Sequence, residues 1–304
     1  MLKRKDGFKY TTREKKEIAT SYSMIAPFCI VFCVFTLIPI FCAVALSFTS
    51  FNMLETPEFT GWVNYRRLFF EDDVFLIALK NTLIFAIVTG PLSYILAFFF
   101  AWLINEMPPK VRVFMTVLFY APSVSGNVYF IWQYMFSNDS YGLVNGLLMS
   151  WGIINEPILW FTDPKYNMVI IIIVQLWLSL GVSFLAFVAG LQSVDKSQYE
   201  AGAVDGVKNR FQELWYITLP AMRPQLMFGA VLTIAGAFSV SDLTVNLAGM
   251  PSVEYAAHTI VNHLSDYGNI RFEMGYACAI ATVLFGIMVF VNRFVTMFIR
   301  RIGK

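Results

Sequence analysis

Long hydrophobic runs separated by shorter polar stretches dominate this chain. Six of these runs are apolar enough to cross a bilayer core, which takes about 20 helical residues. They cover roughly residues 24–48, 78–104, 111–136, 168–191, 221–247 and 274–299. Backbone polar groups cannot stay unpaired in lipid, so the runs predict helices, and they lack the short alternating pattern of a β-barrel. We therefore expect an all-α membrane protein, with one six-helix domain (24–304) after a basic tail (1–23).

Composition agrees with this pattern. The 304 residues are 58% hydrophobic and 14% charged, against about 25% charged in soluble domains. All cysteines lie within hydrophobic runs, where packing is their expected role: Cys29, Cys33, Cys42 and Cys278. His258 and His263 lie in the last polar loop at a spacing that fits neither a helix face nor a zinc pattern, so we assign no metal.

The basic residues predict how the helices are oriented. They concentrate in the N-terminal tail, around Lys110 and Arg112, in the loop 192–220 and at the C-terminus, whereas acidic residues gather in the other loops. Loops rich in Lys and Arg face the cytoplasm. Both termini and the loop 192–220 are therefore expected to be cytoplasmic, and the net charge of +2 gives no reason to expect nucleic-acid binding.

The first hydrophobic run could be mistaken for a secretory signal, because Ala43-Val44-Ala45 resembles a small-residue cleavage site. Its apolar stretch before that point is longer than a typical signal core. We expect an uncleaved membrane anchor.

Several features interrupt the uniform pattern. Gly90-Pro91 and Pro122 with Gly126 fall inside the second and third runs, where they predict either breaks that line a polar cavity or simple kinks. The fifth run is rich in small residues that allow close helix packing at a subunit interface or pore gate: Gly229, Ala230, Ala235, Gly236 and Ala237.

Two polar segments on the opposite side from the termini carry aromatic residues. The segment 59–69 mixes aromatic and basic residues, as an interfacial helix or an aromatic belt would. The long loop Ser137–Asn167 contains Trp151, Trp160 and Phe161. It could receive a partner or pack on itself.

The loop 192–220, called here the signature loop, has the pattern of two capped helices. Ser197-Gln-Tyr-Glu200 is a capping box that predicts a short helix from near Gln198, and Gly206 can end it in a left-handed conformation. A second box, Asn209 to Gln212, predicts another helix before Pro220. The pattern predicts a rigid elbow.

The same loop resembles the signature loop of the membrane subunits of bacterial ATP-binding-cassette importers. That family reads Glu-Ala-Ala, two residues, Asp-Gly-Ala and a helical run ending Ile-Thr-Leu-Pro. This chain has Gly202 and Val207 at two of the Ala positions and one extra residue before Ile217-Thr-Leu-Pro220. The resemblance implies a cytoplasmic coupling-helix loop between helices four and five that seats in a groove of an ATPase. The docking residues it implies are Glu200, Ala201, Gly202, Asp205 and Gly206.

Further stretches are similar to the maltose-type permeases for oligosaccharides and glycerol phosphate. They are Gly61-x-x-Asn64-Tyr65, Asn81-Thr82 and Gly275-Tyr-Ala-x-Ala279. No Gly-x-x-x-x-Gly-Lys-Ser/Thr loop is present, so the chain is not expected to bind ATP, hold a cofactor or act as an enzyme. The resemblance implies a bacterial cell membrane location and four kinds of partner: a second permease, two ATPases, an external binding protein and a carbohydrate.

Polar residues at membrane depth are costly and often functional. Tyr120, Ser123 and Asn127 share one face of helix three, and Ser239, Asp242 and Asn246 share one face of helix five. Gln175 and Trp177 lie in helix four. Amides, carboxylates and aromatic faces suit sugars, so these eight residues are candidates for a substrate path. Interhelical hydrogen bonding is the alternative.

We therefore expect one half of the translocation pathway of an ATP-driven carbohydrate importer. An ion-gradient-driven transporter of a small polar solute is the main alternative. It would require paired intramembrane charges and internal repeats, whereas the runs offer Asp242 alone as a candidate carboxylate and no clear repeat. A membrane enzyme would need clustered His, Asp or Glu, which the runs lack.

Overall fold

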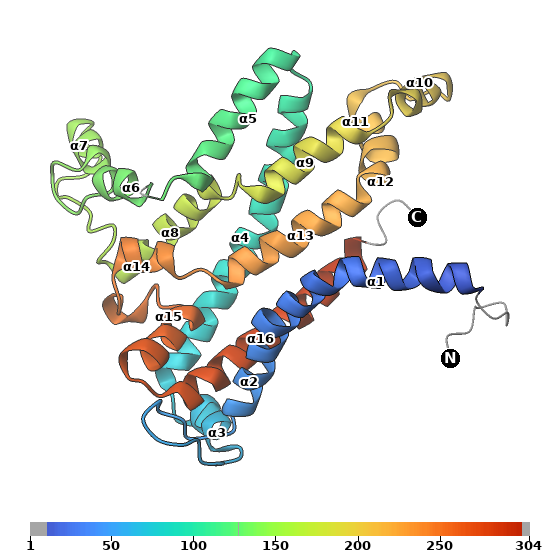
Figure 1. Ribbon diagram of the computed structural model, residues 1–304. Helices are drawn as coiled ribbons and strands as arrows, with labels where there is room; N and C mark the ends of the chain where they lie inside the picture. Colours follow the sequence, from blue (N-terminus) through green and yellow to red (C-terminus); the bar gives the residue numbers. More distant parts are fainter. Residues whose placement is uncertain (1–10, 127, 300–304) are drawn as a thin grey trace.

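The computed structural model describes residues 11–126 and 128–299 and is almost entirely helical (Figure 1). One isolated β-bridge, between Thr49 and Phe59, accompanies the helices in this part of the chain. The elements run α1 (Thr12–Phe32), η1 (Cys33–Leu37), α2 (Ile38–Leu46), α3 (Val63–Phe70), α4 (Asp73–Asn105), α5 (Pro109–Val124), α6 (Tyr129–Met135), α7 (Leu143–Ser150), α8 (Pro164–Leu178), α9 (Val182–Ser193), α10 (Lys196–Val204), α11 (Arg210–Glu213), η2 (Leu214–Thr218), α12 (Leu219–Ala221), α13 (Arg223–Phe238), α14 (Asp242–Ala248), η3 (Val253–Tyr255), α15 (Ile260–Ser265), η4 (Asp266–Ile270) and α16 (Met274–Ile299).

Five stretches are long and apolar enough to cross a membrane: Thr12–Leu46, Asp73–Asn105, Pro164–Ser193, Arg223–Ala248 and Met274–Ile299. The pair α5 and α6 passes the same test as one span bent by 84°. The six predicted runs therefore correspond to five spans and this bent pair. The first helix starts at Thr12, inside the predicted basic tail.

The two proline-containing interruptions have different outcomes. Pro122 and Gly126 mark a true break, because α5 ends at Val124 and the chain turns sharply into α6. Of the two alternatives at Gly90-Pro91, the structure excludes a break, since α4 continues through Pro91 to Asn105. Proline removes one backbone hydrogen bond, but α4 packs along both α9 and α13. This packing keeps the helix continuous.

Two breaks were not predicted. Helices α8 and α9 are separated at Ser179–Gly181, and α13 and α14 at Ser239–Ser241. Both lie within runs of high hydropathy, so the hydrophobic pattern alone does not reveal them. Each places a non-helical stretch of backbone beside α4 or α15.

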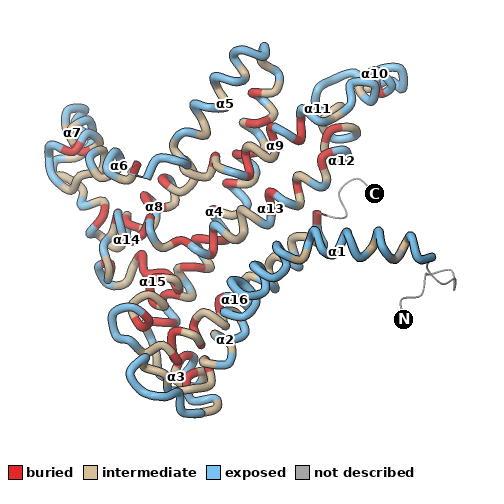
Figure 2. Tube along the Cα trace, viewed as in Figure 1, coloured by how far each residue is buried: buried red, intermediate tan, exposed pale blue. Residues whose placement is uncertain are grey.

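The core lies where α4, α9, α13 and α16 pack together, as the concentration of buried residues in Figure 2 shows. The fifth run was predicted to pack closely at a subunit interface or pore gate. At Gly229 the close packing is against another helix of the same chain. A β-carbon at Gly229 would come within 2.5 Å of the Phe187 ring of α9, so a larger residue there would displace that buried ring. The helix α1 is largely exposed along its length (Figure 2).

The loop Ser137–Asn167 packs on itself. Asn145 of α7 is fully buried and donates to the carbonyls of Ser137, Asp139 and Ile158, while its oxygen accepts from the indole of Trp160 at 2.9 Å. One amide side chain therefore organises the whole loop. Segment 59–69 forms α3 and its approach, with Trp62 71% exposed as an interfacial residue would be.

Candidate functional site

The signature loop forms two short helical limbs at one end of the molecule, opposite α3 and α15 (Figure 1). The first limb, α10, begins at Lys196 and is capped by Asp195, whose carboxylate accepts from the Ser197 amide at 3.0 Å. The predicted Ser197 capping box is therefore wrong. Aspartate is an equally good cap and comes first in the chain. The same amide, followed by the Ser197 hydroxyl, holds the pKa of Asp195 below its usual range.

The turn and the second limb follow the predicted pattern more closely. Gly206 has φ of 92°, in the region that glycine adopts without strain. The Asn209 side chain accepts from the Gln212 amide at 2.8 Å and caps α11. Gln212 accepts in turn from the amide of Lys208 rather than that of Asn209. The limb continues through η2 into α12, where Pro220 precedes the next membrane helix.

The two limbs are in direct contact. Gly202 is buried, and a β-carbon there would lie 2.5 Å from Cδ1 of Ile217. The hydroxyls of Tyr199 and Thr218 are 2.9 Å apart. These contacts hold α10 against η2 and give the elbow its shape.

The remaining docking candidates point outward. Glu200, Ala201, Asp205 and Gly206 are all exposed, and the neighbouring Val204 is 88% exposed. Among the five candidates, only Gly202 is used for internal packing. The exposed face of α10 can therefore accept another protein.

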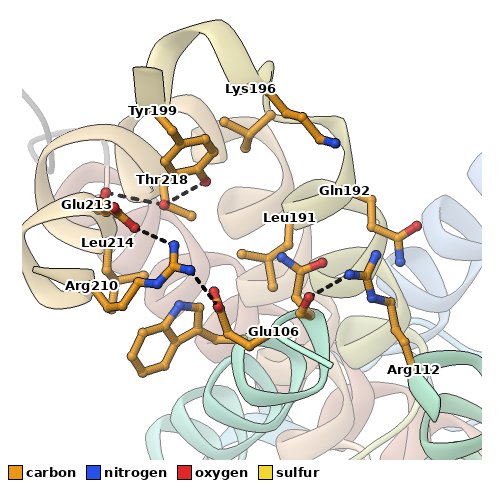
Figure 3. Close-up of a pocket in the computed structure, with 13 residues that line it drawn as sticks. Glu106, Arg112, Leu191, Gln192, Lys196, Tyr199, Arg210, Glu213, Leu214 and Thr218 are labelled. Carbon is orange, nitrogen blue, oxygen red and sulfur yellow. Dashed lines mark hydrogen bonds and ion pairs between the residues drawn. The ribbon is translucent and has the colours of Figure 1, made fainter. Parts of the chain in front are cut away.

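A cavity of about 380 Å³ lies between the signature loop and the ends of α4, α5 and α9 (Figure 3). Arg210 is one of its lining residues and lies within 3.2 Å of Glu106 at the end of α4 and 2.8 Å of Glu213. Beside it, the Trp102 and Phe211 rings are 5.7 Å apart. The second limb is thus attached to α4 by an ion pair and an aromatic contact.

A second, smaller cavity lies within the membrane-spanning bundle, where α4, α8, α9 and α13 meet. Its volume is about 150 Å³. Hydroxyl, amide and small side chains contribute most of its lining: Thr89, Ser93, Gln175, Ser179, Ser183, Thr233, Gly236 and Ala237. We call it the hydroxyl pocket.

Its polar groups are only partly satisfied by the protein. Thr233 donates to the Gly229 carbonyl at 2.8 Å, and its hydroxyl oxygen lies 3.3 Å from that of Ser183. The Ser93 hydroxyl is buried and has no hydrogen-bond partner among the described residues. A buried polar atom without a partner is costly, so the pocket is suited to a polar occupant.

The structure separates the eight predicted substrate-path residues. Gln175 lines the hydroxyl pocket, but Trp177 lines a different, largely apolar cavity of about 610 Å³ next to α5 and packs on Trp132 at 5.3 Å. Ser123 donates to the Tyr120 carbonyl within α5, beside Gly181. Asn127 lies outside the described residues.

The predicted shared face in helix five is wrong. The helix breaks between Ser239 and Asp242, so Ser239 ends α13 while Asp242 opens α14. Asp242 and Asn246 are exposed, and the Asn246 side chain donates to the Asp242 carbonyl at 2.7 Å. The three residues therefore do not line one helical surface.

Most of the hydroxyl pocket was missed from the sequence. Its serines and threonines are short, and such side chains often bond to their own helix, as Thr89 does to the Phe85 carbonyl. A usable signal was the four-residue spacing of Thr89 with Ser93 and of Ser179 with Ser183. Thr89 and Ser93 repeat hydroxyls along one side of α4, whereas Ser179 lies in the break before α9 and Ser183 lies in its first turn.

Comparison with known proteins gives consistent similarities. The family described as "Binding-protein-dependent transport system inner membrane component" matches residues 109–304. "Probable ABC transporter permease protein YesP" of Bacillus subtilis (strain 168) is 32% identical, covering 92% of this chain and 90% of the relative. "Lactose transport system permease protein LacF" of Rhizobium radiobacter is 36% identical, covering 73% and 74%.

Solved structures agree in fold. A chain of a bacterial ABC transporter involved in the import of the acidic polysaccharide alginate superposes with a TM-score of 0.73 at 24% identity, over 96% of this chain and 99% of that one. A second structure of an alginate transporter, in complex with an alginate pentasaccharide-bound periplasmic protein, matches equally well.

Proposed function

The chain belongs to the family of binding-protein-dependent transport system inner membrane components, and we propose that it is the subunit of an ATP-driven importer in which the hydroxyl pocket binds one sugar unit of a carbohydrate as it passes. The unpartnered, buried Ser93 hydroxyl in that pocket is the observation that carries the proposal. A sugar replaces its lost water contacts with hydroxyl and amide groups, and Gln175, Ser179 and Thr233 offer both.

The substrate class has further support from the relatives. One is named for lactose transport and a structural neighbour for alginate import. Both substrates are glycans rich in hydroxyl groups. An oligosaccharide is therefore the proposed cargo.

The exposed face of α10 is the proposed docking site for a cytoplasmic ATPase. Glu200 and Asp205 present carboxylates on this face, and Val204 adds an exposed apolar contact. Because the Gly202–Ile217 contact joins the two limbs and Arg210 joins the second limb to α4, a push on α10 reaches the membrane helices. The distribution of Lys and Arg supports a cytoplasmic position for this loop and both termini.

The proposed assembly contains a second permease subunit, two ATPase subunits and an external binding protein. This chain contributes half of the pathway and no catalytic group for ATP hydrolysis. The second part of this proposal is supported by the sequence, which contains no phosphate-binding Gly-x-x-x-x-Gly-Lys-Ser/Thr loop.

Charge reversal on α10 tests the docking proposal. Glu200→Lys and Asp205→Lys should each reduce copurification of the ATPase and sugar uptake at least tenfold, while membrane insertion stays normal. Gln198→Lys introduces the same side chain, although without removing a carboxylate, at an exposed α10 position outside the motif and should have a smaller effect. Unchanged copurification in both carboxylate variants would contradict the docking site.

Vesicle transport tests the energy source and cargo. Uptake of a labelled oligosaccharide into vesicles that contain the whole complex should require ATP and persist with ionophores present. Uptake driven by an ion gradient without ATP would instead support a secondary transporter.

A further inference from the structure

At the end of the bundle opposite the signature loop, hydrogen bonds connect three side chains: Asp72, which caps α4, His263 of α15, and His258 in the loop before α15. His263 Nε2 lies 3.0 Å from Oδ2 of Asp72, and His263 Nδ1 lies 3.4 Å from Nε2 of His258. The Tyr276 hydroxyl donates to the same Asp72 oxygen at 2.6 Å. Both histidines are at most 3% exposed. The transport function proposed above uses none of these groups.

Charged and aromatic groups from the neighbouring elements surround these hydrogen-bonded side chains. Arg67 of α3 stacks on Tyr276 and Tyr267 and bonds to Glu273, and Arg271 pairs with Asp266 of η4 at 2.7 Å. The Tyr255 ring of η3 packs on the His258 ring, with centroids 5.3 Å apart. Within this shell each arginine faces a carboxylate, so the ring of His258 has no carboxylate in direct contact with it.

The hydrogen bonds allow only one proton between the two histidine rings. Burial alone would raise the pKa of Asp72, but hydrogen bonds from His263, Tyr276 and the Phe75 amide hold it well below its usual range. Asp72 is therefore an acceptor, and His263 Nε2 carries a hydrogen toward it. One proton between His263 Nδ1 and His258 Nε2 makes a bond. A proton on each of these two nitrogens would set two N–H donors against each other and would make His263 a cation, because its Nε2 already carries a hydrogen.

The His258 ring resists taking a proton on its second nitrogen, Nδ1. Burial, and then the charge of His263, lower its pKa from 6.5 to about 4. Its other ring nitrogen, Nδ1, is buried without a hydrogen-bond partner among the described residues. A proton there would also be unsatisfied.

The histidine segment holds the break between α13 and α14. The Thr259 hydroxyl donates to the Val240 carbonyl at 2.8 Å, and Asn262 donates to Thr244 at 2.8 Å. The break begins two residues after Ala237, which lines the hydroxyl pocket. A movement of α15 would therefore release the backbone next to that pocket.

We propose that Asp72, His263 and His258 form a proton-sensitive positioning element that holds the α13–α14 break, and that protonation of the buried, unpartnered Nδ1 of His258 at acidic external pH releases it. The external location and the effect on uptake rest on the proposed transport function. The release itself is a property of the fold and does not.

The direction in which pH changes the opening of this segment follows from His258. Its pKa is lower in the folded segment than in an opened one, so the opened segment binds the extra proton. The closed arrangement is fully favoured above pH 6.5. Its opening constant should rise about tenfold for each pH unit between 6.5 and 4 and level off below 4.

Hydrogen exchange on the complete importer in nanodiscs tests the release. After correction for the intrinsic pH dependence of exchange, amides 257–265 and 240–244 of the wild-type chain should lose protection by about tenfold per pH unit from 6.5 downward. The variant His258→Gln keeps an amide donor near the Nε2 position but cannot take a proton. It should keep the protection of pH 7 down to pH 4.5.

The outcomes separate the two proposals. Equal loss of protection in wild type and His258→Gln, or none in the wild type, would overturn the positioning element. If exchange behaves as expected, right-side-out vesicles should take up sugar more slowly at external pH 4.5 than at pH 7, and the Gln variant should not. An equal ratio for the two proteins would remove the link to transport, whereas no uptake of any sugar at pH 7 would contradict only the proposed function.

Discussion

Gly275 approaches the backbone at Thr49 so closely that a β-carbon on Gly275 would lie 2.0 Å from the Thr49 carbonyl oxygen. The Gly275 amide donates to the Phe51 carbonyl at 2.8 Å. The loop after α2 is held from its other side by Asn64, whose amide donates to the Ser47 and Thr49 carbonyls. Two short motifs, Gly61-x-x-Asn64-Tyr65 and Gly275-Tyr-Ala-x-Ala279, thus meet on one loop.

Gly275→Ala should therefore destabilise this end of the bundle. The new methyl group meets backbone that cannot rotate away, and overpacking of this kind costs about 1–3 kcal/mol. The measurement is the apparent Tm of the purified protein in detergent. Gly286→Ala is the matched control on the same helix, because nothing lies within 4 Å of its β-carbon position, and it should leave the Tm unchanged or raise it. Equal shifts for the two variants would contradict the close approach.

Gly202→Ala restores the residue found in the importer pattern but should cost stability here. The added β-carbon meets Cδ1 of Ile217 at 2.5 Å, and because that atom is the end of a side chain that can turn aside, the expected penalty is near the low end of about 1–3 kcal/mol. Ile217→Val removes that carbon and alone should cost about 0.5–1.5 kcal/mol. In the double variant the losses should be less than additive, because the clash is gone.

A double-mutant cycle of the Tm and of ATPase copurification measures this coupling. Strict additivity would mean that α10 and η2 do not depend on this contact.

Asn145→Ala should loosen the loop Ser137–Asn167. It removes the buried amide that serves several carbonyls and the Trp160 indole, and each buried group left unpaired costs about 1–3 kcal/mol. Limited proteolysis from the external side should cut this loop faster, while the membrane helices stay protected. Asn155→Ala is the control, since Asn155 is exposed in the same loop. An unchanged cleavage rate for Asn145→Ala would exclude Asn145 as its organising residue.

Ser93→Ala should separate stability from transport. Its hydroxyl has no partner among the described residues, so its removal should leave the Tm unchanged or slightly raised. If Ser93 contacts the sugar, the KM for uptake should rise several-fold. Thr282→Val removes a hydroxyl that bonds within α16, to the Cys278 carbonyl, and should not change the KM. A lower Tm with an unchanged KM would assign Ser93 a structural role instead.

The helices themselves were predictable because hydrophobic length is a local property. Each run predicted from the sequence overlaps a membrane-spanning helix or the bent α5–α6 pair. Capping was less predictable. Asp195 and Ser197 are both good caps two residues apart, and the chain uses the first. Local propensity cannot choose between neighbours of similar strength.

Breaks and contacts between helices depended on the whole fold. Pro91 looked like an interruption, yet packing against α9 and α13 keeps α4 continuous. Ser239–Ser241 gave no strong signal, yet α13 ends there and the Thr259 hydroxyl bonds to Val240 inside the break. The free backbone groups are satisfied by residues distant in sequence, which no local pattern can reveal.

The sequence by itself determined that the chain crosses a membrane as helices, and it predicted the two short helical limbs of the signature loop. These properties follow from residue type, spacing and capping over short distances. Only the tertiary structure decided which polar residues meet in the hydroxyl pocket. It also decided that Asp72 contacts His263, 191 positions later in the chain, and through it His258, 186 positions later. Side chains from separate helices become neighbours through packing, and packing is set by the fit of all helices together.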